Sequence, residues 1–278
     1  MAVTQVFRHY FGNLGKYSLA FFLSIIFSPS LTAQSAEQVI VADGTNETDI
    51  PMHQVSIPAK DGFNLNGQFY PGKSDAGGVL LLHDCHHDSD SYDSLLVELS
   101  SLGLNALAID FRGYGQSITE EFSHTEIKRG TKDFATYQLE VARLTAFWPS
   151  DVLSAHQFLR SRIEDTAKVA VVSSGCSALQ AIELAENMRI SAFVMVTPEL
   201  SYMQKESFKN LIDMPIYFMA SVYHANTYTT SKELFDWNGD SRSIFKVFKG
   251  IKHGDSLLKS RGFTVKHVAM WLEDTLAK

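Results

Sequence analysis

Short apolar runs alternate with longer segments of helical periodicity along most of this sequence. Apolar runs that follow glycine or polar residues are typical of strands buried in a parallel sheet. They lie at residues 77–84 (GGVLLLHD), 104–110 (LNALAID), 168–172 (KVAVV), 191–197 (SAFVMVT), 214–221 (MPIYFMAS) and 243–250 (SIFKVFKG). The segments between them place apolar residues three or four positions apart, as amphipathic helices do. This alternation predicts an α/β fold with a mostly parallel central sheet and helices on both of its faces.

Two segments depart from the alternation. Residues 53–72 alternate apolar and polar side chains around Asp61-Gly62, which predicts an antiparallel hairpin ahead of the parallel strands. Residues 118–147 are mixed and polar with weak helical spacing, and we expect them to form a short cap-like insert. The α/β domain then spans residues 51–278, and residues 36–50 form a polar connector.

The first 35 residues have the layout of a signal peptide. A basic start (Arg8, Lys16) precedes an apolar run over residues 17–27, which Pro29 breaks, and small residues follow. Such a run is short for a membrane-spanning helix. We therefore expect an exported protein, periplasmic or secreted, that touches a membrane only through this segment. An uncleaved anchor is the alternative.

Charge and motifs exclude some classes of partner. The chain of 278 residues has a formal net charge of −7, and its Lys and Arg residues form no basic cluster. Nucleic-acid binding requires a basic surface, so we expect no nucleic-acid partner. The sequence contains no phosphate loop or dinucleotide fingerprint, and we expect no cofactor.

Four short motifs follow one another in a familiar order: LLLHD at residues 80–84, DFRGYGQS at 110–117, SSGCS at 173–177 and KHGD at 252–255. Together with the hairpin they resemble the α/β-hydrolase fold superfamily over nearly all of residues 51–278. More closely, the chain resembles exported bacterial hydrolases of the esterase and dienelactone-hydrolase type. The resemblance implies a site at the carboxyl ends of the strands and, in an active relative, an ester or acyl substrate.

In this superfamily the nucleophile sits at the apex of a sharp strand-to-helix turn, with small residues two positions before and after it. If the strand ends at Val172, the apex falls on Gly175, and Ser173 and Ser177 are the small flanking residues. Glycine adopts the strained apex conformation cheaply, but it has no side chain that could attack a substrate. The resemblance therefore implies a vacant nucleophile position. The next residue, Cys176, would supply a backbone N–H of the oxyanion hole.

The rest of the triad is also degenerate. His253 matches the histidine of the superfamily, whereas His224 occupies the position expected for the acid. Glu199, in the loop after residues 191–197, could replace the acid, but we favour a solvated loop residue there. Asp84 would lie beside the oxyanion hole, where its charge would oppose a developing negative charge.

The resemblance places Cys85 and His86 on one side of the oxyanion hole and Cys176 on the other. In an exported protein, two neighbouring cysteines form a disulfide, and we favour a Cys85–Cys176 bond. As an alternative, a turn shifted by one residue would make Cys176 the nucleophile, with His253 as its base.

A metal site is the third possibility. Its ligands would come from the two cysteines, from His86 and His87, and from His224 and His253 across the crevice. The spacing matches no recognised metal motif, so we expect none.

These observations favour an exported α/β-hydrolase-fold protein that is catalytically impaired and keeps a crevice for a small, partly apolar ligand. The alternatives are an active ester or acyl hydrolase that uses Cys176 and His253, and a metal-binding protein with cysteine and histidine ligands.

Overall fold

A computed structural model describes residues 51–211, 214–260 and 262–277. The signal peptide expected at residues 1–35 and the connector at 36–50 lie outside this part of the chain. Among the described residues, no helix combines the length and the apolar character that crossing a membrane requires.

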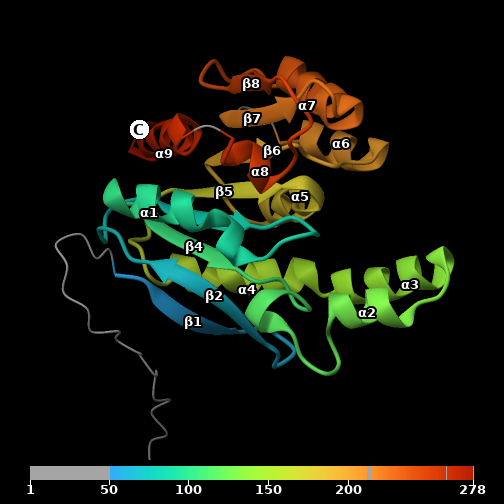
Figure 1. Cartoon of the computed structure of the whole chain (residues 1–278). Coiled ribbons are helices and arrows are strands. Elements are labelled where there is room, and N and C mark those ends of the chain that lie inside the picture. Colours follow the sequence, from blue (N-terminus) through green and yellow to red (C-terminus); the bar gives the residue numbers. More distant parts are fainter. Residues whose placement is uncertain (1–50, 212–213, 261, 278) are drawn as a thin grey trace, which may run out of the picture. The chain divides into compact units, whose positions relative to one another are not determined.

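The described domain is built on an eight-stranded sheet with the order β1-β2-β4-β3-β5-β6-β7-β8 (Figure 1). Its strands are β1 His53–Pro58, β2 Asn64–Tyr70, β3 Gly78–Leu82, β4 Asn105–Ile109, β5 Val169–Ser174, β6 Ala192–Val196, β7 Ile216–Ser221 and β8 Ile244–Phe248. As predicted, β1 and β2 form an antiparallel hairpin, and β2 also pairs antiparallel with β4. All pairings from β4 to β8 are parallel. The mostly parallel sheet expected from the sequence is therefore present.

Helices cover both faces of the sheet. They are α1 Asp93–Ser101, α2 His124–Gly130, α3 Phe134–Thr145, α4 Trp148–Arg160, α5 Ala178–Asn187, α6 Tyr202–Lys209, α7 Ala225–Trp237, α8 Asp255–Leu258 and α9 Gly262–Ala277, with 3-10 turns η1 Ser89–Tyr92, η2 Gly115–Ser117 and η3 Gly175–Ser177. One apolar core joins the sheet to α4, α5, α6 and α7, and a second joins it to α1, α8 and α9. Each face thus buries its own layer of side chains.

The register of the central strands positions the site. Leu82 of β3 lies beside Ser173 of β5, and Ser174 lies beside Val196 of β6. These strands run in the same direction, so the loops that follow them emerge at one edge of the sheet. That edge brings together residues far apart in the sequence, including Asp84 and Gly175.

The insert at residues 118–147 folds into α2 and α3, which lead directly into α4 (Figure 1). Ser123 and Asp133 cap the starts of these two helices by accepting hydrogen bonds from backbone N–H groups. No side chain of α2 is buried, which explains why its sequence shows so weak a periodicity.

A buried arginine fixes the loop after β4. Arg112 donates hydrogen bonds to Asp61, from the hairpin, at 2.6 and 3.0 Å, and to Asp151, from α4, at 2.8 Å. Arg112 and Asp151 are both fully buried, so the Asp151 carboxylate depends on Arg112 for compensation, and Asp61 is a second counter-charge for the arginine. The network ties the hairpin and α4 to the sheet.

Candidate functional site

The turn after β5 is held by its flanking serines. Strand β5 continues to Ser174, two residues beyond the predicted end at Val172, and η3 then leads into α5. The hydroxyl of Ser177 accepts a hydrogen bond from the Ser174 N–H at 3.0 Å and donates to the carbonyl oxygen of Leu82 at 2.8 Å. These bonds join the turn to the neighbouring strand β3 without using the side chain at the apex.

Gly175 lies at that apex with φ +55°, in the left-handed region that favours glycine. A β-carbon built on Gly175 would lie 3.5 Å from Cε1 of His253 and 3.1 Å from Cβ of Asp84. The position therefore faces the imidazole, as a nucleophile position must, but it offers no hydroxyl or sulfhydryl group. Gly175 is the first residue after β5.

The neighbouring cysteine is cross-linked. Cys85 and Cys176 form a disulfide with their Cα atoms 6.0 Å apart, as the sequence led us to favour. The bond occupies the sulfur atoms of both cysteines in the chain. In this state Cys176 cannot act as a thiolate nucleophile, and neither cysteine can be a metal ligand.

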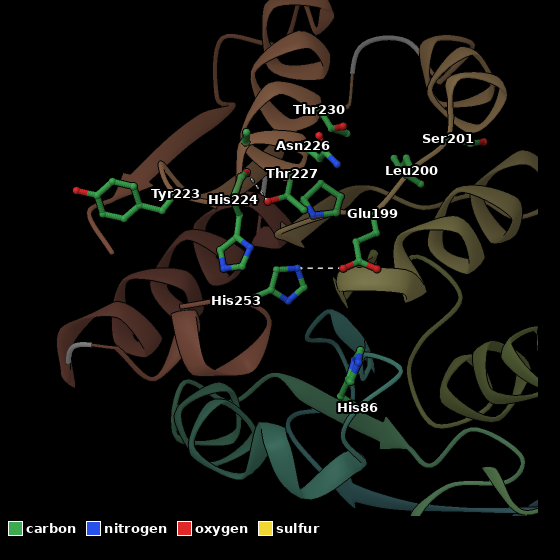
Figure 2. A pocket seen from close by; sticks show the side chains of 12 residues that line it. His86, Glu199, Leu200, Ser201, Tyr223, His224, Asn226, Thr227, Thr230 and His253 are labelled. Carbon is green, nitrogen blue, oxygen red and sulfur yellow. Dashed lines mark hydrogen bonds and ion pairs between the residues drawn. The ribbon is translucent and has the colours of Figure 1, made fainter. Parts of the chain in front are cut away.

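Glu199 corrects our expectation of a solvated loop residue, because it pairs with the histidine. Nε2 of His253 lies 3.2 Å from Oε1 of Glu199, and the hydrogen bond from His253 lowers the pKa of Glu199. Figure 2 shows the two side chains facing each other across the crevice. The acid partner of His253 thus comes from the loop after β6 and not from the loop after β7.

Two hydrogen bonds explain this pairing. Thr197, at the end of β6, adopts φ +46°, and its hydroxyl accepts a hydrogen bond from the N–H of Gly254 at 2.9 Å. The N–H of Glu199 donates to the carbonyl oxygen of Gly175 at 3.0 Å. These contacts hold the carboxylate loop against both the apex turn and the loop of His253.

His224, which occupies the expected acid position, lies beside His253 but makes a different contact. The two imidazole rings are 5.1 Å apart between centroids. Nε2 of His224 donates a hydrogen bond to the carbonyl oxygen of Ile251 at 2.5 Å. This donation holds the ring against the loop that precedes His253, so His224 contributes to the wall of the crevice.

Asp84 is buried beside the apex. Its Oδ1 accepts a hydrogen bond from the N–H of His86 at 2.7 Å and lies 2.9 Å from Nδ1 of His87. The carboxylate is thereby directed into its own loop. A negative charge at this place would still oppose the oxyanion of an acyl-transfer reaction, as expected from the sequence.

A cavity of about 790 Å³ opens over His253 at the carboxyl ends of the strands. It is lined by His86, Pro198, Glu199, Leu200, Ser201, Tyr223, His224, Ala225, Asn226, Thr227, Thr230 and His253. Figure 2 shows His86 on the opposite side of His253 from the residues of α7. None of the lining residues belongs to the insert, so α2 and α3 do not cover this cavity.

No protein-family model and no curated protein matches this sequence. Solved structures do match its fold. A CIB-like hydrolase from Thermoplasma acidophilum is 17% identical with a TM-score of 0.58, and the match covers 81% of this chain and 99% of that one. An esterase from Pyrococcus furiosus is 15% identical with a TM-score of 0.54, over 87% and 100% of the two chains. A dienelactone hydrolase from Anabaena variabilis is 14% identical with a TM-score of 0.55, over 82% and 97%.

At such low sequence identity these matches show a shared fold and nothing about activity. The chain has the α/β-hydrolase fold, with the strand order and the apex turn described above.

Proposed function

We propose that this protein is exported and uses its α/β-hydrolase fold to bind a small, partly apolar ligand without forming an acyl-enzyme. The observation that carries the proposal is the glycine at the apex. A side chain at position 175 would point towards His253, and Gly175 has none. Acyl transfer in this fold requires a nucleophilic side chain at that position, within reach of the histidine. Glycine has none, and the sulfur of the next residue, Cys176, is held in the disulfide.

The cavity has the features of a ligand site. Its volume of about 790 Å³ is in the range of small-molecule pockets. Leu200 and the exposed ring of Tyr223 provide apolar surface, while His86 and His253 provide hydrogen-bonding nitrogens. The Glu199 carboxylate fixes the orientation of the His253 ring. This combination suits a ligand with an apolar body and at least one polar group.

The disulfide supports the export part of the proposal, because paired cysteines persist in oxidising compartments. We propose a periplasmic or secreted location. Fractionation of the producing cells tests it: the protein should leave the cytoplasm, and a variant that lacks residues 1–35 should stay there with free thiols.

The first experiment examines the apex. The oxidised protein should not hydrolyse p-nitrophenyl esters above the buffer rate and should not react with a serine-directed fluorophosphonate. Gly175→Ser should gain labelling, because its β-carbon would lie 3.5 Å from His253. Gly175→Ala is the matched control, since it makes the same backbone change without the hydroxyl. Ester turnover by the natural chain that is lost in His253→Ala would refute a non-acylating site.

The hydrolase alternative rests on the position of Cys176 directly after the apex. If its thiolate were the nucleophile, ester turnover would appear when the disulfide is reduced. It would persist in Cys85→Ala, which frees the Cys176 thiol, and disappear in Cys176→Ala. We expect no turnover in any of these states.

The second experiment examines ligand binding. Thermal shifts measured with a panel of small carboxylates, esters and amides should identify compounds that stabilise the protein. Asn226→Trp would fill part of the cavity and should abolish the shift. Asn187→Trp is the control, because this exposed residue ends α5 and does not line the cavity.

A further inference from the structure

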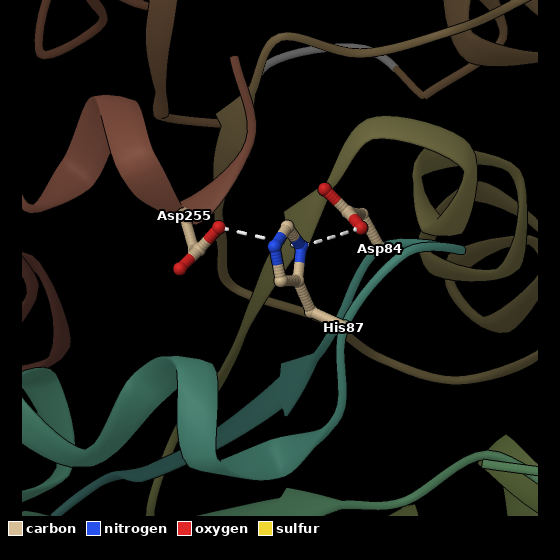
Figure 3. Close-up of side chains that lie close together, drawn as sticks. All are labelled: Asp84, His87 and Asp255. Atoms are coloured by element: carbon tan, nitrogen blue, oxygen red, sulfur yellow. Dashed lines mark hydrogen bonds and ion pairs between the residues drawn. The ribbon is translucent and has the colours of Figure 1, made fainter. Parts of the chain in front are cut away.

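Three potential metal ligands lie together beside the crevice (Figure 3). Asp84 and His87 come from the loop after β3, and Asp255 begins α8, two residues after His253. Nδ1 of His87 lies 2.9 Å from Oδ1 of Asp84 and 3.4 Å from Oδ1 of Asp255. One donor atom from each residue lies within 4.8 Å of the other two.

One of these atoms, Oδ1 of Asp255, accepts no hydrogen bond from the part of the chain that the structure describes. Asp255 is only 8% exposed, and its Oδ1 is buried without a hydrogen-bond partner among the described residues. The other oxygen of the same carboxylate, Oδ2, lies 3.4 Å from Nζ of Lys259. A buried carboxylate oxygen that accepts no hydrogen bond costs free energy, and a bound cation would recover it. The nearest charged neighbour of Asp255 Oδ1 is Nδ1 of His87, at 3.4 Å.

The distances from His87 Nδ1 to the two carboxylates fit a coordination shell. With metal–ligand bonds of about 2.0–2.2 Å, neighbouring donors around a tetrahedral or octahedral ion lie about 3.0–3.4 Å apart. The separations from His87 Nδ1 to the two carboxylates are 2.9 and 3.4 Å. Two carboxylates and one imidazole also form a donor set that suits zinc or manganese.

We propose that Asp84, His87 and Asp255 bind a divalent transition-metal ion, with Zn²⁺ as the best match. The His87 side chain is 44% exposed, which gives the ion a route from solvent and leaves a coordination position for water. The site differs from the one weighed from the sequence, because Cys85 and Cys176 are cross-linked and take no part. His86 takes no part either, since its Nδ1 is 3.8 Å from Asp84 Oδ1 and its side chain is 79% exposed.

The ion would link two walls of the crevice. It would join the loop after β3, which carries Asp84 and Cys85, to the start of α8, which directly follows the His253-Gly254 segment. The site does not depend on the ligand-binding function proposed above, because none of its three ligands lines the cavity.

The test uses the full oxidised chain without a histidine tag, first stripped with EDTA and then titrated with Zn²⁺ by calorimetry. We expect one ion per chain with a Kd of about 10 μM or tighter. At a hundredfold excess over Kd, the melting temperature should rise by about 5–10 °C. Co²⁺ in place of Zn²⁺ should give visible absorption bands, a readout that a structural change alone would not produce.

Asp255→Asn and His87→Ala should each weaken Zn²⁺ binding by more than about tenfold. His86→Ala is the matched control, one residue from His87 on the same loop, and should bind Zn²⁺ with the affinity of the natural chain. Absence of stoichiometric binding, or binding unchanged in Asp255→Asn, would overturn the site. The site would also be overturned if Zn²⁺ did not change the melting temperature while His87→Ala lowered it even in EDTA. That result would show that His87 holds the two carboxylates together without a metal ion.

Discussion

Removing the disulfide should destabilise the domain substantially. Cys85 and Cys176 are 91 residues apart, so the bond closes a long loop in the unfolded chain. In the chain-entropy model a loop of this length contributes about 4.5 kcal/mol of stability at 25 °C. For a domain of this size the melting temperature changes by about 2–4 °C per kcal/mol. We therefore expect the double variant Cys85→Ala/Cys176→Ala to melt about 10–15 °C below the oxidised natural chain.

Calorimetry and urea unfolding of three samples test this reasoning: the oxidised natural chain, the same chain reduced, and the double variant. The reduced chain and the double variant should unfold alike, since the bond acts mainly by restricting the unfolded state. Both should also show a larger m-value, because the uncross-linked chain exposes more surface when it unfolds. Melting temperatures of the oxidised chain and the double variant that agree within about 2 °C would refute the reasoning. So would two thiols that titrate in the unreduced, denatured protein.

Three further predictions concern ionised side chains. Arg112→Met should lower the free energy of unfolding, measured in urea, by about 3–5 kcal/mol, because it leaves the carboxylate of Asp151 buried without a counter-charge. A decrease below about 1 kcal/mol would contradict a buried ion pair. The same arginine lowers the pKa of Asp61 to about 2, so the stability from this contact should be complete above about pH 4 and lost as the pH falls towards 2. In Asp61→Asn the free energy of unfolding should therefore depend less on pH between about pH 4 and 2. An unchanged pH dependence in this range would count against the contact between Asp61 and Arg112. Finally, NMR of the Glu199 carboxyl carbon should show a higher pKa for Glu199 in His253→Ala than in the natural chain, since the hydrogen bond that lowers this pKa is gone. Identical titration curves would exclude the contact between Glu199 and His253.

The architecture and the apex could be predicted because both leave local patterns in the sequence. The apolar runs that became β3 to β8 are short, continuous and bounded by polar residues. Gly175 was assigned to the apex by the resemblance to the superfamily, whose turn has small residues two positions before and after its apex. His253 was recognisable from its place before Gly254 near the end of the chain.

The partner of His253 could not be predicted with the same success. Glu199 looks like an ordinary loop carboxylate, and its loop is brought to the imidazole by two contacts formed only in the folded chain, Thr197 with Gly254 and Glu199 with Gly175. The grouping of Asp84 with Asp255 was missed for the same reason, since the two residues lie on separate segments that meet only in the folded chain. The useful signal would have been a carboxylate two or three residues beyond the end of a central strand, where side chains converge at one edge of the sheet.

The serine pair around the apex has one more consequence. The Ser177 hydroxyl reaches both the Ser174 N–H and the carbonyl oxygen of Leu82, so the bonds that hold the bend do not use the side chain of residue 175. The groups that shape the turn and the position that would carry a reactive side chain therefore belong to different residues.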